Sequence, residues 1–180
     1  VAAANSIVIN HLGETMNKVI SQVKDMGRYV FQTSSSHVLG VAGPGSAAME
    51  MAIANLVMPN DRVLCICNGY FSQRLAELVR RVRGEATILE TRHNESADLV
   101  EVERALQAGS FDAITLVQGE TSNTVHNKHL AAIAQMGKRY GCLVIGDAVC
   151  TVSTMPLEMD NWGIDAIITG GQKGLSSIPG

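Results

Sequence analysis

The sequence predicts an α/β fold in which a mainly parallel sheet carries helices on both faces. Short, almost continuously apolar runs alternate along the chain with segments whose apolar residues recur at helical spacing. Strands that face water on one side would instead alternate apolar and polar residues. The runs are followed by residues typical of turns, among them Gly, Asn and Asp. Buried strands separated by helices are typical of a parallel sheet that is covered on both faces.

These patterns predict each element in chain order. Residues 13–32 predict an amphipathic helix, because Met16, Val19, Ile20 and Val23 fall on one face of it. A turn is expected at 59–61. The further helices are predicted over 47–57, 71–83, 98–108 and 128–140. The strands are predicted over 37–42, 62–67, 86–90, 113–117, 142–145 and 166–169.

The composition excludes several classes of protein. The chain has 180 residues, of which 46% are hydrophobic and 17% charged, so it can bury a substantial core and is not disordered. A net charge of −3 without a Lys/Arg stripe disfavours a nucleic-acid partner, and no apolar run reaches the roughly 18 residues of a membrane span. The four cysteines form no CxxC pair and have no histidine at zinc spacing, which indicates no metal site and a reducing, cytosol-like compartment.

The residues that follow the strands are the candidates for function, because parallel sheets bind ligands at the carboxyl ends of their strands. The Gly-Pro-Gly-Ser turn at 43–46 opens a helix, whose free N–H groups favour a phosphate. The alternative is an ordinary turn with Ser46 as the helix cap. Phe71 could stack on a planar ligand or simply pack in the core. The polar loop 118–124 could line a site or face solvent.

Two charged residues are expected at the same edge. Asp147 leaves a buried strand, which is costly unless the carboxylate meets a cation such as a pyridinium N–H; a helix cap or a structural ion pair is the alternative. Lys173 stands in a Gly-rich turn, where an amine with a lowered pKa could form a Schiff base; a solvated lysine is the alternative. A phosphate cradle, a stacking ring, an acid and an amine together meet the needs of pyridoxal 5'-phosphate (PLP).

Several runs of the sequence resemble the class-V aminotransferases of PLP fold-type I, over nearly the whole chain. The similar subgroup is that of the alanine/serine/ureidoglycine–glyoxylate aminotransferases. The matching runs are GPGSAAME at 43–50, NGYFSQR at 68–74, GETS at 119–122, DAV at 147–149, WGID at 162–165 and GQK at 171–173.

The resemblance implies a role for each matching residue. Lys173 is the Schiff-base lysine and proton shuttle, and Asp147 pairs with the pyridine nitrogen of PLP. Phe71 stacks on one face of the ring and Val149 packs on the other, while Thr121 forms a hydrogen bond near the ring hydroxyl. The implied phosphate contacts are Gly45, Ser46 and Gln172.

The resemblance further implies a homodimer that transfers the amino group of alanine, serine or a similar amino acid to a 2-oxo acid such as glyoxylate or pyruvate. We expect a cytoplasmic protein, with a peroxisomal or mitochondrial location left open. Relatives often have Thr-Gly where this chain has Asn123-Thr124, which leaves the substrate preference open.

We expect residues 1–180 to form the N-terminal part and the PLP-binding large domain, without the C-terminal small domain that carries the substrate-carboxylate arginine in the family. The chain begins without an initiator Met and stops just after the lysine turn, so both ends look cut. Because the family's arginine and its partner-subunit phosphate contacts lie beyond this part, it should be inactive alone. The alternatives are another fold-type I enzyme, such as a cysteine desulfurase or a lyase, and a non-catalytic α/β binding module. A desulfurase usually has a histidine over the ring, where this chain has Phe71.

Overall fold

A five-stranded parallel sheet forms the centre of the molecule in the computed structural model, which describes residues 6–92 and 94–178. Its strand order is β2-β1-β3-β6-β7, and every neighbouring pair is parallel. The predicted fold class is therefore confirmed. The strands are β1 (Arg62–Cys67), β2 (Glu85–Glu90), β3 (Ala113–Val117), β6 (Leu143–Asp147) and β7 (Ala166–Ile168).

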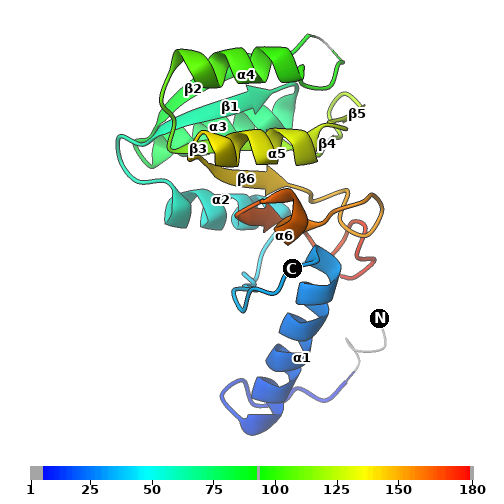
Figure 1. The fold of residues 1–180 in the computed structure, drawn as a ribbon. Coiled ribbons are helices and arrows are strands. Elements are labelled where there is room, and N and C mark those ends of the chain that lie inside the picture. The colour runs from blue at the N-terminus through cyan, green and yellow to red at the C-terminus, as the bar shows by residue number, and fades with distance from the viewer. Residues whose placement is uncertain (1–5, 93, 179–180) are drawn as a thin grey trace.

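Helices cover both faces of the sheet and bury a separate hydrophobic cluster on each (Figure 1). Successive residues of β1 show why the runs are continuously apolar: Leu64 and Ile66 belong to one cluster, whereas Val63 and Cys65 belong to the other. Neighbouring side chains of a strand point to opposite faces, so a doubly covered strand has no polar face. The helices of one face are α2 (Gly45–Leu56) and α3 (Tyr70–Arg81), and those of the other are α4 (Leu99–Ala108) and α5 (Leu130–Arg139).

The first helix, α1 (Glu14–Phe31), projects away from the sheet (Figure 1). It has the predicted amphipathic pattern, yet none of its residues is buried. Val19, Ile20, Val23 and Met26 are all exposed. Only the C-terminal end of α1 is covered, where Val30 and Phe31 pack against the core, so the rest of its apolar face has no partner within the described part of the chain. No helix among the described residues is long and apolar enough to cross a membrane.

The predicted strand over residues 37–42 is wrong. The segment has no regular secondary structure, and Leu39 and Val41 are 66% and 38% exposed. An apolar run becomes a strand only where another strand completes its hydrogen bonds. No strand of the described residues pairs with this one.

Two short features were not predicted. The loop after β3 forms an antiparallel hairpin of β4 (Gly119–Glu120) and β5 (Val125–His126), and α6 (Met159–Trp162) precedes β7. Strands of two residues and a helix of four are too short to show a periodic pattern. The hairpin matters for the site, because it fixes the polar loop that the sequence left open.

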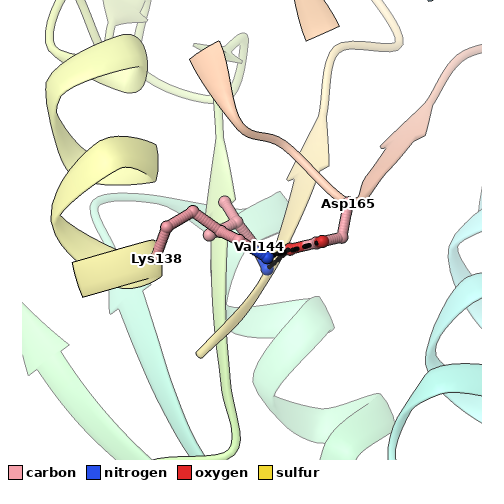
Figure 2. Close-up of polar contacts among 3 residues, drawn as sticks. All are labelled: Lys138, Val144 and Asp165. Atoms are coloured by element: carbon pink, nitrogen blue, oxygen red, sulfur yellow. Dashed lines mark hydrogen bonds and ion pairs between the residues drawn. The ribbon is translucent and has the colours of Figure 1, made fainter. Parts of the chain in front are cut away.

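Asp165 joins three elements of the fold just before β7 (Figure 2). Its carboxylate accepts hydrogen bonds from Lys138 Nζ at 2.8 and 3.1 Å and from the backbone N–H of Val144 at 2.8 Å. Gly163, which has φ of +75°, turns the chain between α6 and β7. The WGID run therefore sets the start of β7, and with it the position of the lysine turn that follows.

Candidate active site

A cavity of about 220 Å³ brings together all eight residues that the sequence analysis named as site residues. They come from five separate parts of the chain that meet at the carboxyl ends of the strands. This is the edge at which parallel sheets bind ligands. The named residues in the lining are Gly45, Ser46, Phe71, Thr121, Asp147, Val149, Gln172 and Lys173.

The first turn of α2 lies in the wall of the cavity. Pro44, with φ of −70° and ψ of 167°, is the N-cap, so Ser46 is the second helical residue and not the cap. The hydroxyl of Ser46 makes no hydrogen bond within the described part of the chain. The N–H groups of a first helical turn have no acceptor in the helix, and the helix dipole adds positive potential there. This turn can therefore bind an anionic group.

Asp147 ends β6 and is 3% exposed. Burial is the main cause that raises its pKa to about 6; the hydrogen bond from the backbone N–H of Val149 to Oδ1, 2.8 Å long, lowers it, and the charge of Glu120 raises it. No Lys or Arg of the described residues forms an ion pair with it. A buried carboxylate without a cation favours a ligand that brings a cationic N–H donor. The alternative of a structural ion pair is therefore wrong, although Asp147 does stabilise the turn after β6.

The aromatic residue of the wall is Phe71, in the first turn of α3. Its half-buried ring contacts the ring of Tyr70 edge-on, with centroids 5.3 Å apart and planes at 89°. Tyr70 does not line the cavity, so among the described residues Phe71 is the one that offers it an aromatic surface. Val149 lies in the same wall and packs against the glycine side of the α2 turn. A flat ligand could therefore have Phe71 and Val149 as apolar neighbours.

Lys173 and Gln172 lie in the turn that follows β7 and line the same cavity. Both residues are also exposed to solvent. The turn is held by hydrogen bonds from the backbone N–H of Ser176 to the carbonyl of Lys173 at 2.9 Å and from Ser177 to Gly171 at 2.8 Å. Lys173 thus stands beside the cavity as an accessible amine, and the structure gives it no buried environment.

The polar loop after β3 divides its side chains between two tasks. Gly119 and Thr121 line the cavity. Gln118 is buried and structural, since it accepts a hydrogen bond from Thr151 Oγ1 at 2.6 Å and donates one to the carbonyl of Pro156 at 2.9 Å. Glu120 is fully buried. Neither alternative for this loop, a site or a solvent-facing loop, describes it fully, because Gln118 and Glu120 are buried inside the fold.

Further residues line the wall that were not predicted from the sequence. Cys150 follows the DAV run directly and donates its thiol hydrogen to the carbonyl of Gly119 at 3.0 Å. Burial raises the pKa of this thiol. Its position next to Val149 was the one signal that could have identified it. Met49 and Val117 were also not predicted, whereas Pro44 and Gly119 belong to the 43–46 turn and the 118–124 loop that the sequence indicated as a whole. Among the described residues, no group of His, Cys, Asp and Glu could hold a metal ion.

Comparisons with known proteins agree with this geometry. The family model described as aminotransferase class-V matches residues 2–180. The chain is 34% identical over 179 residues to the alanine–glyoxylate aminotransferase of Oryctolagus cuniculus, covering 99% of this chain and 45% of that protein.

Two crystal structures superpose closely. An alanine–glyoxylate aminotransferase from Nostoc sp. gives a TM-score of 0.96 at 31% identity, over 99% of this chain and 47% of the other. A ureidoglycine–glyoxylate aminotransferase from Bacillus subtilis gives 0.93 at 28% identity, over 98% and 45%. The chain thus spans slightly less than half the length of each of these relatives.

Proposed function

Because the chain belongs to the class-V aminotransferase family, we propose that the intact protein is a PLP-dependent aminotransferase that uses a small amino acid and a 2-oxo acid. The observation that carries the proposal is the meeting of Asp147, Lys173 and the first turn of α2 around one cavity. The family is PLP-dependent, and these groups fit that cofactor: an anion site, a buried carboxylate without a cation, and an accessible amine.

Each residue of the wall has a task in this proposal. The first turn of α2, through Gly45 and Ser46, and the amide of Gln172 would hold the phosphate. Phe71 and Val149 would flank the ring, and the hydroxyl of Thr121 would bind near the ring oxygen. These contacts orient the cofactor before any chemistry takes place.

The chemistry needs one acid and one base. PLP, when bound, supplies an electron sink that lets a proton leave the α-carbon of an amino acid. The carboxylate of Asp147 would hold the proton on the pyridine nitrogen, because a nearby negative charge favours the protonated, cationic form of that nitrogen. Lys173 Nζ would hold the cofactor through its aldehyde group, with loss of water, and once a substrate amine takes that place its free amine would take up and give back the α-proton.

We propose alanine or serine as amino donor and glyoxylate or pyruvate as acceptor. The support is the similarity to proteins named alanine–glyoxylate and ureidoglycine–glyoxylate aminotransferases. A related protein named L-aspartate–glyoxylate aminotransferase is 28% identical, so aspartate is the competing donor in the test below.

We further propose that the protein works as a homodimer in the cytoplasm. The exposed apolar face of α1 supports an interface, because an uncovered stripe of this kind on a helix is expected to pack against another chain. Sedimentation of the intact protein tests the dimer, and a monomer at micromolar concentration would contradict it.

The function is tested with a panel of donors and acceptors. Purified intact protein with PLP is supplied with alanine, serine or aspartate, each with glyoxylate or pyruvate, and kcat/KM is measured for every pair. We expect alanine or serine with glyoxylate to give the highest value. Turnover of aspartate alone would overturn the donor assignment, and no transamination with any pair would overturn the function.

A further inference from the structure

Glu120 is a carboxylate that the proposed chemistry does not use, although it is the only glutamate or aspartate among the described residues that is 0% exposed. It lies in β4 and faces the start of α3. A fully buried charge is costly unless its oxygens are hydrogen-bonded. The charge of Glu120 therefore depends on the donors that surround it.

Five hydrogen bonds satisfy the two oxygens of Glu120. Oε1 accepts from the hydroxyl of Ser122 at 2.6 Å, from the backbone N–H of Ser122 at 3.3 Å and from that of Phe71 at 3.4 Å. Oε2 accepts from the backbone N–H of Ser72 at 3.0 Å and from its hydroxyl at 3.1 Å. Burial raises the pKa of Glu120, but these donors outweigh it and leave the pKa below its usual value. Glu120 is thus an anion with hydrogen-bond donors at both of its oxygens.

Glycine at position 69 makes room for this carboxylate. A Cβ there would lie 2.5 Å from Cδ of Glu120 and 2.6 Å from Oγ of Ser122, closer than real Cβ contacts come. The N-cap of α3 has no side-chain oxygen of its own, so Glu120 supplies from another segment the acceptor that a capping residue would provide. Its negative charge also matches the positive end of the α3 dipole.

The same contacts connect two parts of the cavity wall. Phe71 is one of the residues whose N–H is bound by Glu120, and Thr121 follows Glu120 directly in the chain. Ser122 strengthens the connection by accepting a hydrogen bond from the backbone N–H of Tyr70 at 2.9 Å. A shift of the carboxylate would therefore move the ring of Phe71 relative to Thr121.

We propose that Glu120 is a positioning residue, whose carboxylate fixes the Phe71 ring and the Thr121 hydroxyl at a set separation across the cofactor cavity. The inference rests on the proposed function for the identity of the ligand, but the contacts of Glu120 exist without a ligand. Glu120 does not line the cavity and acts only through its neighbours.

The test replaces Glu120 with glutamine, which keeps the size of the side chain. An amide offers one oxygen and one N–H₂ group, so either the donors at Oε1 or those at Oε2 would face another donor. The matched control is Glu77→Gln, the same change on the exposed side of α3, where Glu77 pairs only with Arg81.

Amide hydrogen exchange of the intact protein without PLP gives the first result. In Glu120→Gln we expect the amides of Phe71 and Ser72 to exchange at least tenfold faster, with α5 unchanged, and Glu77→Gln to match the wild type. Unchanged exchange at Phe71 and Ser72 would overturn the proposal. Acceleration that is uniform over the whole chain would also overturn it, because that is the result of general destabilisation.

The affinity for PLP gives the second result. The Kd of PLP, followed by the induced circular dichroism of the bound cofactor, should rise about tenfold in Glu120→Gln. Faster exchange with an unchanged Kd would overturn the positioning role. If the wild type itself binds no PLP, the proposed function fails, whereas the exchange result still decides whether Glu120 holds α3.

A second variant covers the case in which Glu120→Gln does not fold. Ser122→Ala removes only the Ser122 hydroxyl and should raise the Kd of PLP about threefold. An unchanged Kd in Ser122→Ala would overturn the proposal.

Discussion

Gly45 presents its α-carbon directly to the side chain of Val149: a Cβ built on Gly45 would lie 3.2 Å from Cγ2 and 3.3 Å from Cγ1 of Val149. The proposed phosphate turn and the proposed ring contact are thus in van der Waals contact with each other. These distances are tight, so an added methyl group would push Val149 by a few tenths of an ångström.

Gly45→Ala should therefore separate stability from cofactor binding. Alanine favours a helix over glycine by about 0.5–1 kcal/mol, so the Tm of the protein without PLP should stay the same or rise. The Kd of PLP should rise several-fold, because Val149 moves into the cavity. Differential scanning fluorimetry and a PLP titration measure the two quantities. A lower Tm with an unchanged Kd would contradict the account.

Asp147→Asn should stabilise the protein without PLP at neutral pH. The folded-state pKa of about 6 lies above the usual value of 3.8, so the folded state binds more protons than the unfolded state between these values. Relative to Asp147→Asn, the wild type therefore has its full stability below about pH 4 and loses it as pH rises through about 6.

The size of this effect follows from about two pKa units at about 1.4 kcal/mol each, which gives at most about 3 kcal/mol. Urea unfolding from pH 4 to pH 8 measures the difference in the free energy of unfolding. The two curves should meet near pH 4, separate between about pH 4 and pH 6, and run parallel above that, with the asparagine variant the more stable. The variant should nevertheless bind PLP more weakly, since the amide cannot hold a cationic N–H as well. If the free energy of unfolding of the wild type instead rose relative to that of the variant as pH increased, the raised pKa of Asp147 would be contradicted.

Phe71→Leu should weaken PLP binding while Phe71→Trp should preserve it. Leucine keeps much of the packing of Phe71 in the cluster beneath it but removes the aromatic face. Stacking contacts are worth about 0.5–1.5 kcal/mol, so the Kd should rise roughly 2- to 12-fold. Tyr70→Leu is the control, because that ring does not line the cavity. Equal effects of the two leucine variants would argue against stacking at Phe71.

Asp165→Ala should destabilise the fold more than Lys138→Ala does. Removal of Asp165 leaves the buried N–H of Val144 without its acceptor, which costs about 1–3 kcal/mol. Removal of Lys138 breaks only an ion pair whose side chains are 44% and 28% exposed, so about 0–1 kcal/mol is expected. Urea unfolding of the two variants measures both values. Equal losses would mean that the ion pair, and not the bond to Val144, carries the effect.

The parallel sheet could be predicted from the sequence, because strands that are buried on both faces are continuously apolar, as residues 63–67 are. The sequence was also sufficient to bring Asp147 and Lys173 to one edge, since the carboxyl ends of parallel strands meet there. It failed at residues 37–42, where an apolar run has no pairing partner among the described residues. Strand formation depends on a neighbour that local composition does not reveal.

The role of Glu120 could not be predicted from the sequence either, because it too depends on tertiary contacts. Its five hydrogen bonds come from its own loop and from α3, 48 residues earlier in the case of Ser72. A glutamate in a polar loop gives no sign that it will be buried. Only the close approach of Gly69, which is itself a tertiary contact, creates the space for it.

The central claim is that Lys173 binds PLP in this cavity, and the visible absorption spectrum of the intact protein tests it most directly. Wild type and Lys173→Ala are compared after addition of PLP, with Lys138→Ala as a lysine control outside the cavity. We predict a yellow band of lysine-bound PLP in wild type and in Lys138→Ala, its absence in Lys173→Ala, and bleaching of the band by alanine or serine. A wild-type protein that stays colourless with PLP, or a band that survives in Lys173→Ala, would contradict the claim; the first result would leave a non-catalytic α/β module.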